Sequence, residues 1–406
     1  MTAVSDSRAT DLRAAGPTVH FDELMQQPPT AACEHFKMIK ALQEQGSVHF
    51  GEASGNPFWV FTHIEDQRAA YQNPQVFSSS AVVPDSPNPP YFWIPEMLDA
   101  PLHNRWRKLL GPLFSPGAVE AMEAKIRERF TVVMDSVAVK GSCEFNQEVA
   151  LKLPNQVFMD LMGLPVKDAD QFQVWETQIL HEGSSASETG MQAAMAVHAY
   201  FDKLINERRG GALKDDILSK AMGWEIDGAP ISHEDLLAFC LLMFMAGLDT
   251  VATQLCYTMF HLATNPHDRQ RLVDDPSLIP AAMEEFLRYY AFVTPGRKVL
   301  QDTELAGQTL RAGDMVFLPL VAANRDAAEF PDADKVIIDR PDNRHIAFGA
   351  GPHRCLGAHL ARLELSIALT LWLERVPDFR IDASVPIREH GGQIGLINLP
   401  LEWDLG

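Results

Sequence analysis

Phe348-Gly-Ala-Gly-Pro-His-Arg-Cys355-Leu-Gly357 is the stretch of this 406-residue chain that says most about its fold and chemistry. Cys355 precedes a run that is predicted to be helical, from Leu356 to about Leu373. The positive end of a helix dipole and its unpaired N–H groups favour a thiolate at that place. Glycines upstream let the backbone turn tightly and lie close to a flat group. The segment therefore predicts a metal-binding thiolate, with a plain buried cysteine beside a glycine turn as the alternative.

The complete pattern Phe-Gly-X-Gly-X-His-X-Cys-X-Gly resembles the haem-binding loop of the cytochrome P450 family. Six fixed positions rarely match by chance, which disfavours the plain buried cysteine. The resemblance implies haem b as the cofactor and Cys355 as its axial thiolate and metal ligand, an arrangement that favours cleavage of the O–O bond. It also implies that Phe348, Gly349 and His353 contact the haem.

Composition indicates an ordinary soluble protein with a large core, since 46% of the residues are hydrophobic. No linker or repeat divides the chain, so we expect a flexible N-terminal segment (1–16) and one catalytic domain (17–406). The N-terminus lacks the apolar core of a signal peptide. The longest strongly apolar run, Leu236–Leu248, is too short to span a bilayer. We therefore expect a cytoplasmic protein without a membrane anchor.

Charge and cysteine content exclude some classes of function. The formal net charge of -20 argues against a nucleic-acid partner. Five scattered cysteines, none with CxxC spacing, suggest neither a zinc site nor a disulfide scaffold. Local basic clusters could still dock an acidic redox partner, with ordinary solvated helix faces as the alternative. These clusters contain Arg105, Arg107 and Lys108, then Lys125, Arg127 and Arg129, and finally Arg344, His345 and Arg354.

Periodicity predicts a mainly α chain with small β-sheets, an α+β fold. The predicted helices are 116–137, 191–208, 233–262, 279–290 and 356–375. The predicted strands are 48–52, 58–62, 297–300 and 315–320. Residues 84–95 are rich in proline and aromatic residues, so we expect an irregular loop there.

The apolar segment in the middle of the chain is predicted to be one long buried helix that begins after Ser232 and runs to about Ala263. Ser232 with an acid three residues later is typical of a helix N-cap. Halfway along, Asp249 and Thr250 place a charge and a hydroxyl where burial is costly. They are either a satisfied polar pair that bends the helix, with Thr250 bonding back one turn, or a functional site.

The sequence Ala246-Gly-Leu-Asp-Thr250 resembles the oxygen-activating groove of cytochromes P450. The resemblance implies that Thr250 and Asp249 are catalytic: Thr250 stabilises bound, reduced dioxygen, and Asp249 relays protons to it. It implies that Ala246 lies against the haem. It also implies a triangular-prism fold in which the haem lies between this long helix and the helix that follows Cys355.

Two further groups of charged residues fit the same family. Glu285 and Arg288 lie three residues apart on one helix face, and with Arg340 they resemble the family's structural Glu-X-X-Arg set. Haem carries two propionates that need cations, and the resemblance assigns this role to four residues. They are His103, Arg107, Arg297 and His353.

The closest likeness is to the camphor-hydroxylating group of the family. Tyr91-X-Trp93-Ile-Pro resembles its substrate-covering loop, although Trp93, Met245 and Pro295 depart from the expected residues and make camphor itself doubtful. Apolar walls with one hydroxyl suit a terpenoid or norisoprenoid, with a packed loop aromatic as the alternative for Tyr91. The expected pocket residues are Tyr91, Trp93, Leu242, Met245, Ala246, Thr250 and Val293.

The resemblance thus implies a monooxygenase that uses O2, a small hydrophobic substrate, and electrons from NAD(P)H through a reductase and an iron–sulfur ferredoxin on the proximal face. Two rival functions stay open. One is a haem-thiolate peroxygenase that uses hydrogen peroxide, and the other is a haem-binding or sensing protein without turnover.

Overall fold

The computed structural model describes residues 12–15, 19–21, 30–89, 91–180, 188–211, 213–391 and 393–405. Helices predominate in these residues, which confirms the predicted mainly α class. The helices are α2 (Glu34–Gln45), α3 (Ile64–Gln72), α4 (Leu102–Leu110), α5 (Pro116–Glu120), α6 (Glu123–Ala138), α7 (Lys152–Met162), α8 (Ala169–Leu180), α9 (Glu188–Arg209), α10 (Ile217–Ala221), α11 (His233–Gly247), α12 (Asp249–Thr264), α13 (Pro266–Asp274), α14 (Ile279–Tyr289), α15 (Leu320–Asn324) and α16 (Ala358–Arg375).

The strands are short and form small sheets. They are β1 (Val19–His20), β2 (Thr30–Ala31), β3 (Val48–Ala53), β4 (Asn56–Phe61), β5 (Phe77–Ser78), β6 (Ser142–Glu144), β7 (Glu225–Ile226), β8 (Ala229–Pro230), β9 (Gly296–Val299), β10 (Thr303–Leu305), β11 (Gln308–Leu310), β12 (Met315–Phe317), β13 (Arg380–Ile381), β14 (Arg388–His390), β15 (Gly395–Leu396) and β16 (Pro400–Glu402). The largest sheet has the order β1-β3-β4-β12-β9-β5, with the β1–β3 and β4–β12 pairs parallel. Two three-stranded sheets, β13-β16-β6 and β15-β14-β2, bring the C-terminal strands against earlier segments.

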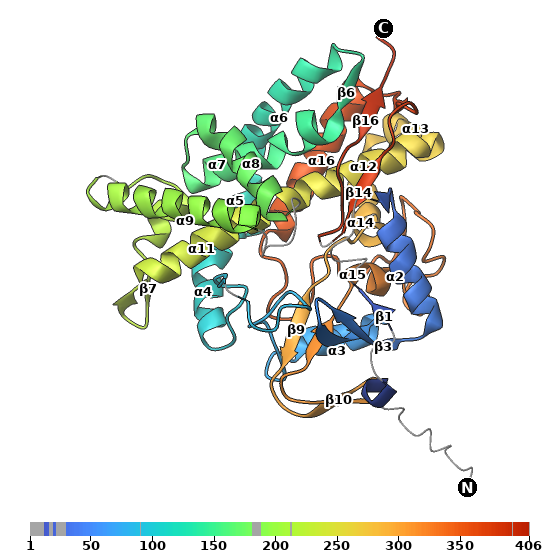
Figure 1. Cartoon of the computed structure of the whole chain (residues 1–406). Helices are drawn as coiled ribbons and strands as arrows, with labels where there is room; N and C mark the ends of the chain where they lie inside the picture. Colours follow the sequence, from blue (N-terminus) through green and yellow to red (C-terminus); the bar gives the residue numbers. More distant parts are fainter. Residues whose placement is uncertain are drawn as a thin grey trace.

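Figure 1 shows a helix-rich part around α6 to α11 and a smaller part that holds the largest sheet with α2 and α3. Helices α12 and α16 pack against each other between these parts. The main hydrophobic core extends from Phe21 to Trp403 in sequence, and a second cluster lies around the largest sheet. The core therefore joins residues from nearly the whole described chain.

The long central helix begins as predicted but is interrupted. The Ser232 side chain accepts a hydrogen bond from the Asp235 N–H, which confirms the predicted N-cap. The prediction of one continuous helix is wrong in detail, because α11 ends at Gly247 and α12 begins at Asp249. Thr250 Oγ1 donates to the Ala246 carbonyl at 3.1 Å, a back-bond that bends helices. The whole span, His233–Thr264, is long and apolar enough to cross a membrane, but 56% of its most apolar window is buried against the rest of the chain, as in a core helix.

Other boundaries differ from the predictions by a few residues. The predicted helix 116–137 is two helices, α5 and α6. The predicted strand 315–320 is shorter, since β12 ends at Phe317 and Leu320 belongs to α15. The helix after Cys355 begins at Ala358 rather than Leu356. Most of the segment predicted to be flexible, 1–16, lies outside the described residues, whereas its residues 12–15 form a short 3-10 helix.

Candidate active site

Glycines with positive φ values and backbone hydrogen bonds shape the loop before α16. The Cys355 N–H donates to the Phe348 carbonyl at 2.8 Å. Gly349 and Gly351 have φ values of +69° and +68°, a region that side chains rarely adopt. A Cβ on Gly351 would approach the Tyr71 carbonyl oxygen to 2.2 Å, whereas a Cβ on Gly349 would meet nothing within 4 Å. The loop therefore packs tightly on one side and leaves space on the other.

The Cys355 thiol faces that space. Burial raises the pKa of this thiol, and hydrogen bonding from the Gly357 N–H opposes the rise. The predicted stabilisation of the thiolate by an N–H group at the start of the helix is present. In the protein alone, however, burial raises the pKa by more than this hydrogen bond lowers it. A metal cation bound beside the sulfur would favour the thiolate form.

A large cavity of about 930 Å³ opens in front of Cys355. Its walls come from α11, α12, α16, the loop before Cys355 and the loop around Tyr91. Most of the predicted site residues line this one cavity, although they are scattered along the chain. Those that line it are Tyr91, Trp93, Arg107, Leu242, Met245, Ala246, Thr250, Val293, Arg297, Phe348, Gly349, His353 and Cys355.

Cationic side chains gather at one edge of the cavity. Burial, together with the charges of His103, Arg297 and Arg107, lowers the pKa of His353 to about 2. His353 Nδ1 has no hydrogen-bond partner among the described residues. Arg297 is 4% exposed, and among the described residues the acid that pairs with it is Glu96, at 3.9 Å. Arg107 and Arg297 therefore place positive charge at this edge, which suits anionic groups.

These features fit haem. A thiol faces a cavity bordered by a glycine loop, and an unpartnered ring nitrogen and buried guanidinium suit propionate groups. His103 stacks on His353, with ring centroids 3.8 Å apart. It is not among the residues that line the cavity, so direct contact of His103 with haem stays a prediction.

Gly247 and Thr250, on either side of the interruption in the central helix, line the same cavity as Cys355. Thr250 lines the cavity, whereas Asp249 is 3% exposed and points into a hydrogen-bonded environment. Asp249 Oδ2 accepts from Gln393 Nε2 at 2.6 Å and from Thr253 Oγ1 at 3.3 Å. The two interpretations of this pair are compatible, because both polar groups are hydrogen-bonded and Thr250 also borders the cavity.

Two aromatic rings cover the cavity on another side. Tyr91 and Trp93 stack with centroids 4.5 Å apart and planes 20° apart. Burial and the nearby Asp85 raise the pKa of Tyr91 to about 12. Its hydroxyl is therefore a neutral group that can donate a hydrogen bond.

The predicted structural set is present as a network centred on the fully buried Glu285 and Arg288. Arg288 donates to both carboxylate oxygens of Glu285 at 2.7 Å. Arg340 Nε donates to Glu285 Oε2 at 3.0 Å, and the Ile337 N–H donates to Oε1 at 2.8 Å. Arg288 also donates to the Asn324, Ala333 and Lys335 carbonyls. The network ties α14 to the segment that leads into the Cys355 loop.

Sequence reasoning missed three polar groups at the cavity. Gln393 approaches it from the turn after β14, and no sequence pattern marks this residue. Glu364 on α16 is 3% exposed, its Oε2 has no partner in the described chain, and burial raises its pKa to about 8. Glu364 could have been singled out from the sequence, because it is an acid inside an apolar helical run. Glu96 lies beside Arg297 and Arg107, and burial raises its pKa in spite of them.

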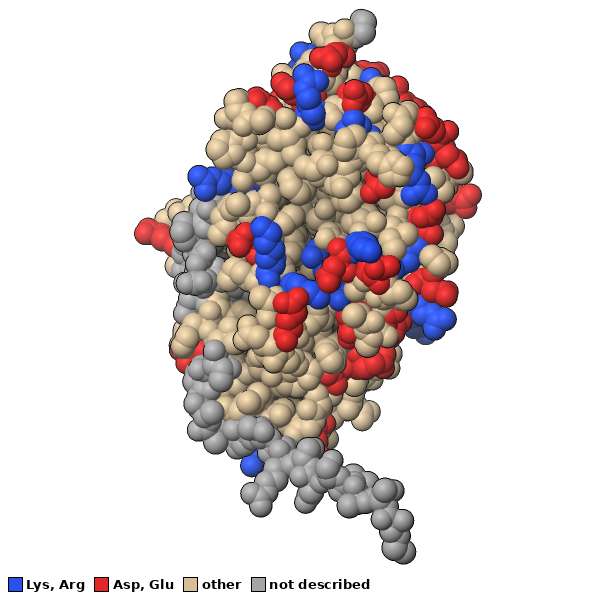
Figure 2. All heavy atoms as spheres, turned by 90° about the vertical axis from the view of Figure 1, so that its right-hand side faces the viewer, with Lys and Arg blue, Asp and Glu red and all other residues tan. Residues whose placement is uncertain are grey.

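The basic clusters predicted for partner docking are partly neutralised. Lys125 and Arg129 both pair with Asp160, and Arg127 pairs with Glu123. Lys108 and Arg354 are exposed. On the face drawn in Figure 2, basic and acidic side chains likewise lie next to each other rather than in separate patches.

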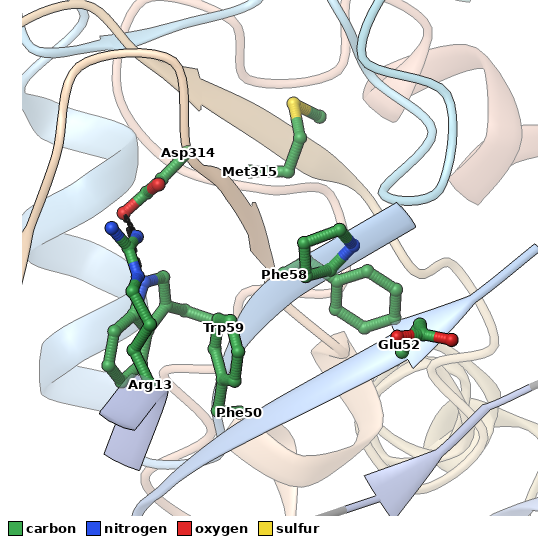
Figure 3. A pocket seen from close by; sticks show the side chains of 8 residues that line it. Arg13, Phe50, Glu52, Phe58, Trp59, Asp314 and Met315 are labelled. Carbon is green, nitrogen blue, oxygen red and sulfur yellow. Dashed lines mark hydrogen bonds and ion pairs between the residues drawn. The ribbon is translucent and has the colours of Figure 1, made fainter. Parts of the chain in front are cut away.

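A second, smaller hollow of about 440 Å³ lies over strands β3, β4 and β12 (Figure 3). Arg13 forms an ion pair with Asp314 there and lies over the rings of Phe50 and Trp59. The hollow shares no lining residue with the large cavity. Its contacts fix the short helix 12–15 on the sheet, so we regard it as a packing site.

Comparison with known proteins agrees with this geometry. The family model "Cytochrome P450" matches residues 130–401. A Sinorhizobium fredii protein named "Probable cytochrome P450 127A1" is 36% identical over 92% of this chain and 91% of its own. The mycinamicin IV hydroxylase/epoxidase of Micromonospora griseorubida is 33% identical over 86% and 90%. The crystal structure of CYP101J2 superimposes with a TM-score of 0.85 at 28% identity and covers both chains completely.

Proposed function

The chain belongs to the cytochrome P450 family, and from that premise we propose that it is a monooxygenase that inserts one oxygen atom of O2 into a C–H bond of a small hydrophobic substrate. The observation that carries the proposal is the position of Cys355, which faces the cavity that Thr250 borders from the interrupted helix. Members of this family use haem, and the cavity, the thiol and the cations fit that group.

The residues that would hold haem come from several parts of the chain. Cys355 would ligate the iron, and Phe348 and Gly349 would lie against the ring on the same side. Arg107, Arg297 and His353 would bind the propionates, with His103 behind His353. Ala246 would face the ring from α11. When bound, haem supplies the redox and oxygen chemistry, and the protein supplies orientation and electrostatics.

The proton chemistry is proposed for Thr250 and Asp249. The overall reaction, RH + O2 + 2H⁺ + 2e⁻ → ROH + H2O, consumes two protons in a cavity whose walls are largely apolar. Thr250 holds its hydroxyl at the cavity surface through its bond to Ala246, and Asp249 lies one residue earlier with a buried carboxylate. Asp249 therefore passes protons to the hydroxyl of Thr250, which presents them at the cavity surface.

We propose a terpenoid or norisoprenoid ketone or alcohol as the substrate, as in the camphor-hydroxylating group. The wall is apolar at Leu242, Met245 and Val293, and Tyr91 offers one neutral donor. A rigid hydrocarbon with a single acceptor satisfies both features.

Electrons are proposed to come from NAD(P)H through a reductase and a ferredoxin that docks beside the Cys355 loop. The exposed side chains of Lys108 and Arg354 support an acidic partner at this place. We also propose a cytoplasmic location. We propose a single catalytic domain, residues 17–406, because the main core joins residues from Phe21 to Trp403.

Optical titration of the ferric protein with β-ionone, camphor, an aromatic acid and a fatty acid tests the substrate class. A ligand that enters the cavity beside bound haem would change the spin state of the haem and with it the absorption spectrum. We expect the largest change with the cyclic terpenoid or norisoprenoid and weaker binding in Tyr91→Phe. Tyr200→Phe is the control, because Tyr200 bonds Asp168 and does not line the cavity. A response to fatty or aromatic acids alone would overturn the substrate class.

The peroxygenase alternative differs in its need for proton delivery. Hydrogen peroxide brings both electrons and both protons, so an enzyme that uses it needs no Asp249–Thr250 pair. The buried, hydrogen-bonded Asp249 favours the O2-dependent reaction. Efficient turnover with peroxide alone would favour the peroxygenase, and no NADH consumption with any competent redox partner would favour a sensor.

A further inference from the structure

A hydrogen bond joins the substrate cavity to the buried acid of the central helix. Gln393 lines the cavity from the turn between β14 and β15, and its Nε2 donates to Asp249 Oδ2 at 2.6 Å. Thr253 Oγ1 donates to the same oxygen at 3.3 Å. Hydrogen bonds to an ionised group are the strong ones in proteins, and those that a carboxylate accepts favour its charged form.

A second buried carboxyl group lies on α8, which packs toward the interruption of the central helix. Glu176 on α8 is 2% exposed, and its Oε1 has no hydrogen-bond partner among the described residues. One turn earlier, Phe172 packs on Phe158 and Phe244, with ring centroids 5.9 and 5.6 Å away. Phe158 in turn closes over Gly247, where a Cβ would come within 3.2 Å of its ring. This face of α8 therefore points at the interruption of the central helix.

The two acids influence each other. Burial raises the pKa of Glu176 well above its ordinary range, and the charge of Asp249 raises it further. Two neighbouring carboxyl groups in a buried site do not both ionise readily, so one keeps a proton. Asp249 receives donors from Gln393 and Thr253, whereas Glu176 lacks one at Oε1. Hydrogen-bond donors favour the charged form of a carboxyl group, so these contacts favour charge on Asp249 over charge on Glu176.

We propose that Gln393 is a positioning residue for Asp249: its amide, supplied from the wall of the cavity, holds Asp249 as the ionised member of a buried carboxyl pair and leaves the proton on Glu176. The importance of this for turnover rests on the proposed monooxygenase function, but the distribution of charge does not. An ionised Asp249 can take up a proton and pass it to the hydroxyl of Thr250, and a neutral Glu176 is a proton donor within the protein. Where proton delivery to the cavity fails, the two electrons and two protons would convert O2 into H2O2, and the substrate C–H bond would stay intact.

Infrared spectroscopy of the ferric protein tests the charge distribution without any substrate. A protonated carboxylic acid has a C=O stretch that a carboxylate lacks and that shifts in deuterium oxide. In wild type we expect such a band to be lost in Glu176→Gln and kept in Asp249→Asn. In Gln393→Met the band should instead depend on Asp249, so that adding Asp249→Asn removes part of it. Subtraction of variant spectra separates this band from those of other buried acids such as Glu364.

Two variants of Gln393 and a control variant distinguish loss of the amide from loss of the folded structure. Gln393→Met keeps the length of the side chain without the amide, and Gln393→Asn keeps the amide but shortens its reach. Ile397→Met is the matched control, because Ile397 is exposed on the same hairpin and does not line the cavity. Equal haem content and thermal unfolding in all of them exclude misfolding. A Glu176 band that is unchanged in both Gln393 variants would overturn the proposal, as would a wild-type band that belongs to Asp249.

The functional consequence is tested with β-ionone, NADH and a competent redox partner. In Gln393→Met, product per NADH should fall by about tenfold, which corresponds to about 1.4 kcal/mol, and hydrogen peroxide should rise to match. NADH consumption and the peroxide-driven yield should stay near wild type. Coupling equal to wild type in this variant would contradict the positioning role. If wild type itself forms no product from β-ionone, the substrate class fails, and the infrared result still decides the inference.

Discussion

The imidazole rings of His103 and His353 stack with centroids 3.8 Å apart, and His353, which lines the cavity, has an Nδ1 without a hydrogen-bond partner among the described residues. This contact joins α4 to the loop of Cys355. It places a buried hydrogen-bond donor or acceptor beside Arg297 at the edge where a haem propionate would lie.

Haem retention tests this cationic edge. Arg297→Gln removes a buried guanidinium from the cavity, and we expect its affinity for haem to fall by about tenfold or more, because a hydrogen bond to a charged group is worth about 1.5–3 kcal/mol. The measurement is transfer of haem to an excess of an apo-globin. Lys298→Gln is the control, because Lys298 lies next to it but bonds Pro87 and Asn88 outside the cavity. Equal haem loss from both variants would contradict the assignment.

Thr250→Ala should separate NADH consumption from product formation. Positioned proton transfer typically contributes at least about 100-fold to a rate, so product per NADH should fall by about tenfold or more while hydrogen peroxide accumulates. Thr264→Ala is a matched control, since Thr264 Oγ1 makes the same bond, one turn back, to Phe260 at 2.8 Å and does not line the cavity. Full coupling in Thr250→Ala would remove Thr250 from the mechanism.

Two similar Glu→Gln substitutions should differ widely in their effect on the free energy of unfolding, because one breaks a buried ion pair and the other an exposed one. Glu285→Gln leaves the guanidinium groups of Arg288 and Arg340 buried without their carboxylate and should lower the free energy of unfolding by about 3–5 kcal/mol. Glu65→Gln breaks an exposed pair with Arg68 at the same spacing and should change it by less than about 1 kcal/mol. Urea unfolding measures both. Similar losses would mean that the Glu285 network does not hold the fold.

Glu364 predicts a stability that declines as the pH rises. Its pKa is raised from 4.5 to about 8 in the folded protein, so between these values the folded state binds a proton that the unfolded state has lost. Stability from this group is therefore greatest below about pH 4.5 and falls by about 1.4 kcal/mol per pH unit until about pH 8.

The measurement for Glu364 is the free energy of unfolding at several pH values in wild type and in Glu364→Gln. The variant should lose this decline and be the more stable protein at the alkaline end. Glu374→Gln, an exposed position on the same helix, should keep the wild-type slope. The same slope in all three proteins would show that Glu364 is already ionised at neutral pH.

Features encoded by neighbouring residues could be predicted from the sequence. The Cys355 loop is contiguous, Glu285 and Arg288 are three residues apart, and the Ser232 cap is local, so each pattern contains its own geometry. The P450 fold followed from these motifs. Even the back-bond of Thr250 was foreseeable, although its consequence, an interruption at Leu248 rather than a smooth bend, was not.

Features that depend on distant segments could not be predicted. Gln393 meets Asp249 only because the turn after β14 folds over the start of α12, and Glu176 reaches the same place from α8. Gly351 must be glycine because Tyr71, far away in sequence, lies against it. The charges of Arg127 and Arg129 looked available for a partner, but acids from their own helix and from α7 neutralise them.

The most direct test of the central claim is the difference spectrum of the reduced protein with and without carbon monoxide. We predict the long-wavelength Soret band of thiolate-ligated haem in wild type and in Cys143→Ser, and its loss in Cys355→Ser. A protein that binds no haem, or a band that survives in Cys355→Ser, would contradict the role of Cys355 and the function built on it.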